Sequence, residues 1–172
     1  MSEVLDKMQT RRSIRRYKSD MLPKEVIEKI VEAGTFAASG MNLQTPVIIA
    51  VTNKEIRDKM SKANAQVMGS ENDPFYGAPV VLVVLAEKKG TYVYDGSLVM
   101  GNLMLAAHEL GIGSCWIHRA KEVFEQEEWK QWLKSLGLNG EYEGIGNCVL
   151  GYADGEYPGV LPRKEERVYF VE

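Results

Sequence analysis

The sequence predicts an α+β fold. Two runs of mostly β-branched apolar residues, 46–52 and 78–87, continue without alternation, which is typical of strands buried on both faces. Segments with a helical period lie between and around them, and the segment 95–111 is apolar on nearly all sides. Helices and strands are mixed along the chain and helices predominate, so the expected class is α+β.

The elements of the first half alternate in type. They are a short helix, an amphipathic helix, a buried strand, a second amphipathic helix and a second buried strand, at residues 3–9, 23–39, 46–52, 54–68 and 78–87. The helix at 23–39 opens with Pro23, whose fixed φ suits the first turn of a helix. Its apolar residues, from Val26 to Val31, share one face.

The second half predicts a helix, a short strand, a helix and two strands, at residues 95–111, 114–117, 125–137, 146–153 and 167–172. The helix 95–111 has almost no polar face, so it belongs in a core or a subunit interface, and Gly111 supplies its C-terminal cap. The helix 125–137 carries acids in its first turn and Lys134 near its end, as the helix dipole favours. Trp129, Trp132, Leu133 and Leu136 form one stripe of it and are expected in the core.

Composition bounds the class of protein. With 172 residues, of which 45% are apolar, the chain is expected to form one domain, 1–172. A net charge of −3 disfavours a general nucleic-acid or membrane-surface binder. The two cysteines, Cys115 and Cys148, are the sparse usage of a reducing compartment, and no stretch has the apolar length of a signal peptide core or a membrane span. We therefore expect a cytoplasmic protein without a membrane partner.

Positive charge gathers in the stretch "RRSIRRYKSD", residues 11–20. The chain has 21 Lys and Arg against 24 Asp and Glu, and without the five cations of residues 11–18 the balance is 16 against 24, or −8. Two interpretations remain open: a solvated cluster at a helix end, or an anion site in which guanidinium groups and the Ser13 hydroxyl bind a phosphate. Nucleic-acid binding lacks support, because no aromatic residue beyond Tyr17 is interleaved.

Two other segments carry polar side chains that suit a ligand. Arg163 and Lys164 follow Pro162 near the end of the chain and could join the same phosphate if the terminal segments meet. The stretch "AASGMNLQTP", residues 37–46, presents Ser39 and Asn42 on a turn-rich connection. Amide donors and acceptors suit a heterocycle, although a helix cap followed by a turn is the simpler explanation.

Four stretches together, "RRSIRRY", "AASGMNLQTP", "LGIGSCWI" and "PRK", resemble in this order the nitroreductase family of FMN flavoproteins. The resemblance covers essentially the whole chain. It implies an α+β sandwich with a mixed or antiparallel sheet and an intertwined homodimer built around the helix near 95–111, with FMN at the subunit interface.

The resemblance also implies which residues contact FMN. The phosphate and ribityl chain would be held by Arg11, Arg12, Ser13 and Arg15, with Arg163 and Lys164 completing the phosphate site. The ring would meet Ala38, Ser39 and Asn42 of the second subunit, and Trp116, Ile117 and His118 largely through backbone atoms. Arg16 and Lys18 are expected to be solvated.

The implied activity is that of an NAD(P)H-dependent flavin oxidoreductase. NAD(P)H would deliver hydride to the flavin N5 and leave before a nitroaromatic, quinone or enone takes its place, with no catalytic side chain required. Two other possibilities stay open: a flavin store or sensor with little turnover and, with less support, an anion-binding or nucleic-acid-binding module. Two histidines and two distant cysteines offer no metal-ligand spacing. His108 is expected to be a structural cation at a helix end, and Cys115 a small buried residue.

Overall fold

A four-stranded antiparallel sheet lies at the centre of the computed structural model, which describes residues 2–172. The strand order is β1-β2-β4-β3. The strands are β1 (Pro46–Val51), β2 (Val80–Glu87), β3 (Gly113–Ile117) and β4 (Tyr142–Gly151). The expected α+β class with an antiparallel sheet is confirmed.

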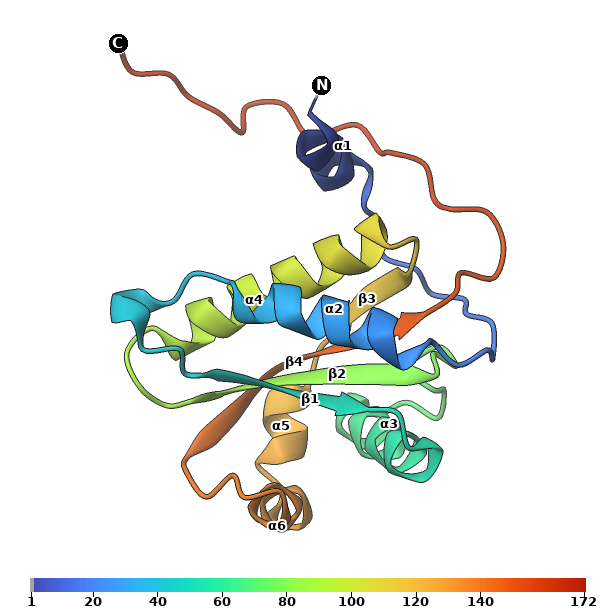
Figure 1. Cartoon of the computed structure of the whole chain (residues 1–172), viewed down its shortest axis with the longest axis vertical. Coiled ribbons are helices and arrows are strands. Elements are labelled where there is room, and N and C mark those ends of the chain that lie inside the picture. The colour runs from blue at the N-terminus through green and yellow to red at the C-terminus, as the bar shows by residue number, and fades with distance from the viewer. Residues whose placement is uncertain (1) are drawn as a thin grey trace.

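Helices cover both faces of the sheet (Figure 1). One face carries α2 (Lys24–Thr35) and α4 (Tyr92–Glu109), and the other carries α3 (Lys54–Met68), α5 (Ala120–Phe124) and α6 (Glu127–Ser135). The first helix, α1 (Glu3–Thr10), lies at the C-terminal end of α4, where Lys7 pairs with Glu109 at 3.3 Å. Two layers of helices therefore enclose one layer of strands.

Strand β2 contributes to both cores, which explains its uninterrupted apolar run. Every residue from Val80 to Ala86 is 0% exposed. Val81, Val83 and Leu85 pack with α3, α5 and α6, whereas the alternate residues pack with α2 and α4. Because both faces of the strand are covered, neither face needs polar side chains.

The helix predicted at 95–111 begins earlier, at Tyr92, and ends at Glu109, with Gly111 in the left-handed region at φ 72°. Its buried face, which includes Met100 and Leu103, packs on the sheet. The opposite stripe is uncovered in this chain, since Tyr94 is 73% exposed and Leu98 51% exposed. The core placement is thus correct for one face of α4 only.

Three further predictions differ from the structure. The tail 167–172, predicted as a strand, has no strand partner in this chain and runs past α1 and away from the body (Figure 1). Helix α2 ends at Thr35 rather than 39, and α5 was not foreseen because five residues are too few for a periodic signal. Leu136 lies at the C-cap of α6 and is half exposed, whereas Trp129 and Leu133 are buried as predicted.

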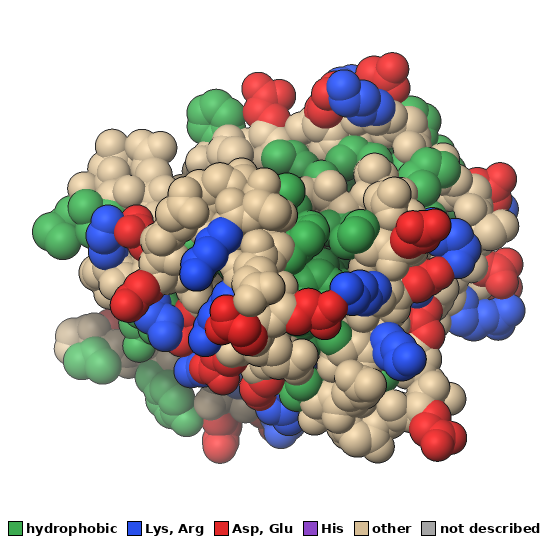
Figure 2. Space-filling model, turned by 90° about the horizontal axis from the view of Figure 1, so that it is seen from below, with side chains coloured by type: hydrophobic (Ala, Val, Ile, Leu, Met, Phe, Trp, Pro, Cys, Tyr) green, Lys and Arg blue, Asp and Glu red, His purple; other side chains and the backbone are tan. Residues whose placement is uncertain are grey.

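The face beneath the sheet carries charges of both signs. Figure 2 shows acidic and basic side chains interspersed around apolar side chains on this face. Lys59 of α3 forms an ion pair there with Glu128 of α6. Within residues 2–172, no helix has the combined length and apolar character that a membrane crossing requires.

Candidate functional site

The basic stretch runs in extended form along the free edge of β3. Ser13 forms a bridge with Ser114, whose carbonyl oxygen accepts from the Ile14 backbone N–H at 2.9 Å. Ile14 is buried, so its neighbours Ser13 and Arg15 turn the other way, as alternation along an extended chain requires. Burial raises the pKa of the Cys115 thiol, while Arg15, Ser13 and Arg11 act to lower it. All three groups are therefore near enough to β3 to act on the Cys115 thiol.

Two guanidinium nitrogens of this stretch are buried without a partner. Arg12 Nε donates to the Gly159 carbonyl oxygen at 3.2 Å, and Arg12 Nη1 donates to the Arg11 carbonyl oxygen. Arg12 Nη2 and Arg11 Nη1 are buried and have no hydrogen-bond partner among the residues described. A buried charged donor is costly unless an acceptor meets it. The donor set therefore fits an anion with several oxygens, such as a terminal phosphate.

Other cations of the stretch behave as solvated charges. Arg16 pairs with Asp154 at 3.3 Å, and its side chain is 77% exposed. Lys18 is also exposed, and its backbone N–H donates to the Tyr152 carbonyl oxygen. The two interpretations of the stretch thus apply to different residues: Arg11 and Arg12 suit the anion site, and Arg16 the solvated cluster.

The C-terminal segment reaches the basic stretch through Gly159. Arg163 and Lys164 lie farther along the tail, where they are exposed and line a hollow of the tail itself with Glu166 and Arg167. Gly159 accepts a hydrogen bond from Arg12, whereas within residues 2–172 neither Arg163 nor Lys164 forms a hydrogen bond or ion pair with the basic stretch. The tail is therefore beside the anion site, with its cations outside it in this arrangement.

The segment Trp116–His118 stands at the other end of the same edge strand. At about 3.3 Å per residue, His118 lies roughly 13 Å along the chain from Ser114. The Trp116 side chain crosses Gly146, where an added Cβ would come within 2.5 Å of Nε1, and this Nε1 is itself buried without a partner. Arg119, with φ 78°, then turns the chain into α5. Strand β3 thus has the guanidinium donors beside one end and the segment Trp116–His118 at the other.

A pocket of about 300 Å³ borders Trp116 and His118. Lys121 and Glu143 also line it, and they pair at 3.3 Å. Tyr92 of α4 donates its hydroxyl to the same carboxylate at 3.4 Å. This pocket could not be predicted from local sequence patterns, because antiparallel pairing of distant segments brings its lining together.

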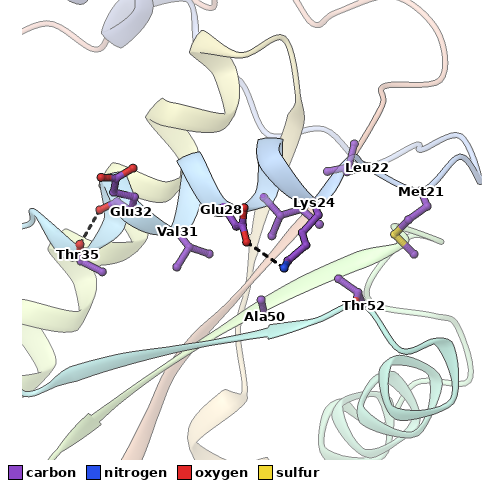
Figure 3. A pocket seen from close by; sticks show the side chains of 10 residues that line it. Met21, Leu22, Lys24, Glu28, Val31, Glu32, Thr35, Ala50 and Thr52 are labelled. Carbon is purple, nitrogen blue, oxygen red and sulfur yellow. Dashed lines mark hydrogen bonds and ion pairs between the residues drawn. The ribbon is translucent and has the colours of Figure 1, made fainter.

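A larger pocket lies elsewhere, between α2 and the outer strand β1 (Figure 3). It measures about 870 Å³ and is lined mainly by apolar groups such as Leu22, Val31 and Ala50. On its rim, Lys24 pairs with Glu28 at 3.3 Å. No residue of the predicted FMN site lines it, so volume alone does not identify the candidate site.

The loop that carries Ala38, Ser39 and Asn42 is tightly folded and includes the 3₁₀ turn η1 (Gly40–Asn42). Ser39 Oγ accepts from the Gln44 backbone N–H at 3.1 Å, and Asn42 Oδ1 accepts from Gln44 Nε2 at 2.9 Å. Three non-glycine residues adopt positive φ: Met41 (50°), Asn42 (54°) and Gln44 (49°). Such conformations cost on the order of 1–3 kcal/mol each and are frequent at functional sites.

The loop and the basic stretch lie at opposite ends of α4. Gly40 of the loop donates its N–H to Asp95 at 3.1 Å, in the first turns of the helix. Thr10, just before the arginines, contacts His108 at 2.9 Å, in its last turn. At 1.5 Å per residue, Asp95 and His108 are about 20 Å apart along the axis. One chain therefore does not unite the two halves of the predicted FMN site.

Comparison with known proteins gives consistent results. The family model described as "Nitroreductase family" matches residues 8–74 and 66–152. A crystallised Bacteroides fragilis nitroreductase with bound FMN is 30% identical, with a TM-score of 0.88 and 100% of both chains covered.

Two archaeal relatives, both with names that pair NADH dehydrogenase with NAD(P)H nitroreductase, differ in coverage. The Archaeoglobus fulgidus protein is 36% identical over 163 residues, which cover 91% of this chain and 88% of the relative. The Methanothermobacter thermautotrophicus protein is 32% identical over 124 residues, which cover 66% of this chain and 60% of the relative.

His108 joins α4 to α1 and to the tail. Thr10 Oγ1 donates to the Asp6 carbonyl oxygen at 2.8 Å, so it accepts from His108 Nε2–H at 2.9 Å. Nδ1 is then free to accept from the Tyr157 hydroxyl at 3.1 Å. Burial, together with Lys7, Arg11 and Arg12, lowers the pKa of His108, against the opposing charge of Glu109. The expected cation at the helix end is thus disfavoured, first by burial and then by the cations beside it.

This pKa shift predicts a pH-dependent stability for the flavin-free protein. Below about pH 6.5, unfolded chains protonate His108, whereas the folded chain resists protonation. The free energy of unfolding should therefore fall as the pH drops from about 6.5 to the lowered pKa of His108 in the folded state. His108→Gln should flatten the dependence of the free energy of unfolding on pH. This would be measured by urea unfolding between about pH 7.5 and about pH 5, the range in which histidines titrate. Equal profiles for the parent and His108→Gln would contradict the prediction.

Proposed function

Because this chain belongs to the nitroreductase family, we propose that it is an FMN-dependent oxidoreductase that passes hydride from NAD(P)H to a small organic acceptor. The observation that carries this proposal is the pair of buried, unpartnered nitrogens Arg11 Nη1 and Arg12 Nη2. The phosphate of FMN brings the acceptors that these donors lack. Residues 1–172 act in this proposal as one FMN-binding domain.

Each part of the chain has a distinct task. The phosphate and the ribityl chain are held by Arg11, Arg12, Ser13 and Arg15. The tail adds the positive charge of Arg163 and Lys164 when it closes over the phosphate. Trp116, Ile117 and His118 line the ring along the end of β3. When bound, FMN supplies the hydride-accepting chemistry, while the protein supplies orientation and electrostatics.

Substrates enter beside His118. The pocket of about 300 Å³ has room for a flat ring and is bordered by Lys121 and Glu143. NAD(P)H and the acceptor use this space in turn, which gives ping-pong kinetics. The acceptor class that suits it is a nitroaromatic, a quinone or an enone.

We propose a homodimer in which each site takes residues from both subunits. The uncovered stripe of α4, which includes Leu98 and Gly101, would pack against the same stripe of a second copy. A two-fold axis near the middle of α4 would bring the start of one helix towards the end of the other. The loop with Ala38, Ser39 and Asn42 would then reach the FMN held by the arginines of its partner.

The tail supports an intertwined form of this dimer. Its apolar side chains are exposed, with Phe170 at 87% and Val168 at 71%. They belong to a run of β-branched and aromatic residues, 168–171, which favours a strand. Strand β1 is the outermost strand of the sheet beside the apolar pocket of Figure 3. The tail of one copy could therefore pair with β1 of the other, which would supply the strand partner that the single chain lacks.

The two cysteines support a cytoplasmic location. Cys115 and Cys148 are buried free thiols in the two different cores. Neither is used as a cross-link, which suits a reducing compartment.

Activity is tested by rapid mixing of the FMN-loaded protein with NADH and with NADPH. We expect the flavin absorbance to bleach with at least one of them and to return when a quinone is added. A protein that binds FMN but is not reduced by either nucleotide would instead be a flavin store or sensor.

The arginines can be tested in a matched pair. Arg12→Ala removes a buried charged donor, and hydrogen bonds to charged groups contribute about 1.5–3 kcal/mol, so FMN affinity should fall by roughly ten- to hundredfold. Arg16→Ala, which removes an exposed ion pair, should bind FMN like the parent. Equal losses in both variants, measured by fluorescence titration, would contradict the assignment.

The dimer can be tested with two leucines of similar exposure. Leu98 on α4 is 51% exposed and Leu136 at the end of α6 is 50% exposed, on opposite sides of the sheet. Leu98→Arg should yield monomers that bind FMN poorly, because a charge would be buried at the interface. Leu136→Arg should remain dimeric in sedimentation. A monomeric parent that binds FMN would overturn the proposal.

A further inference from the structure

Asp95 is a buried carboxylate in a mostly apolar helix. It is 3% exposed and lies in the first turn of α4. Its Oδ1 accepts from the Gly40 backbone N–H at 3.1 Å and from the Thr91 hydroxyl at 2.9 Å. Its Oδ2 is buried and has no partner within residues 2–172. Only one of its two oxygens is therefore satisfied inside the chain.

Such a group is expensive to keep for stability alone. Burial of a carboxylate is unfavourable unless charges or several donors compensate, and Asp95 has two neutral donors and the positive end of the helix dipole. An apolar residue would suit the surrounding core better, because it leaves no oxygen unsatisfied. The contact with Gly40 is the feature that an apolar residue could not reproduce.

That contact is the tie between the loop and the rest of the chain. The hydrogen bonds that Ser39, Asn42 and Gln44 make lie within the loop itself. For loop residues 38–44, the bond from Gly40 to Asp95 is the only hydrogen bond recorded to another element of the described chain. The loop also contains three strained non-glycine residues, so it needs an external contact to stay in one conformation.

Gly40 must approach α4 closely for this bond to form. An added Cβ at Gly40 would come within 2.1 Å of Thr91 Oγ1, a separation that forces the neighbours apart. Glycine at position 40 and aspartate at position 95 are thus both needed for this hydrogen bond. Two substitutions far apart in sequence should therefore release the same loop.

We propose that Asp95 is a positioning residue that fixes the loop Ser39–Asn42 in the conformation in which its side chains meet the ring of FMN. The ring contact rests on the proposed function, whereas the tie between Asp95 and the loop does not. Asp95 acts through Gly40 and touches neither FMN nor substrate.

The experiment compares Asp95→Ala, Gly40→Ala, the double variant and Asp95→Asn in the full chain. The first readout is amide hydrogen exchange of loop residues in the flavin-free protein, followed by NMR. Loss of the bond should speed exchange at Gly40 by about tenfold in Asp95→Ala. Asp95→Asn keeps an oxygen acceptor and should stay within about threefold of the parent.

The second readout is the FMN-loaded protein. Asp95→Ala and Gly40→Ala should each weaken FMN binding by about tenfold and slow flavin reduction by NAD(P)H even when FMN is saturating. The double variant should be no worse than the poorer single variant, because both changes release one loop. Thr91→Val is the control, since it removes the other donor to Oδ1 and leaves the Gly40 bond in place.

The outcomes test the contact between Asp95 and the loop separately from its effect on FMN. Parent-like exchange at Gly40 in Asp95→Ala, or a uniform increase along α4, would overturn the tie between Asp95 and the loop. Faster loop exchange with unchanged FMN affinity and reduction would overturn the positioning role. Gly40→Ala provides the same test if Asp95→Ala does not fold. A parent that binds no FMN would contradict the proposed function, and the exchange result would still decide the tie.

Discussion

The packing of α4 on the sheet fixes the position of both halves of the candidate site. Met100 and Leu103 on its buried face are fully covered by the core that includes alternate residues of β2. Its first turns hold the loop through Asp95, and its last turn contacts the residue before the arginines through His108. Because the helix is rigid and 18 residues long, these contacts cannot approach one another within a chain. The proposed composite site between two copies would bring the two halves together across the dimer.

The basic stretch places some of its charge where burial makes it costly. Arg11 and Arg12 each leave a buried nitrogen without an acceptor, and the same cations disfavour protonation of His108 nearby. An incoming phosphate would relieve both effects, since it supplies acceptors and offsets the local positive charge. The unpartnered nitrogens therefore support the proposal that this stretch binds an anion.

Local patterns in the sequence were enough to predict most elements. The uninterrupted run of β2 was recognisable because burial on both faces of a strand removes polar alternation. Helix α4 was recognisable because its sequence has almost no polar face. The tail pattern at 167–172 indicated a strand, but a strand needs a partner, and none lies in this chain. Helix α2 stops at Thr35 because the following residues enter the strained loop.

Long-range contacts account for what could not be predicted. Asp95 was not singled out from the sequence, because its partner Gly40 lies 55 residues earlier. The arginine cluster was visible too, but which of its nitrogens are buried depends on the Gly159 contact, 147 residues after Arg12. The residue types of the site could be read from the sequence, whereas the hydrogen-bond partners of these residues could not.

The most direct test of the central claim compares FMN with riboflavin, which lacks only the phosphate. Dissociation constants for both would be measured by fluorescence quenching of the full chain at one ionic strength. If Arg11 and Arg12 bind the phosphate, two charge-assisted contacts should make FMN bind at least about a hundredfold more tightly. Affinities within about threefold of each other (less than 1 kcal/mol) would show that the buried arginine nitrogens serve some other purpose.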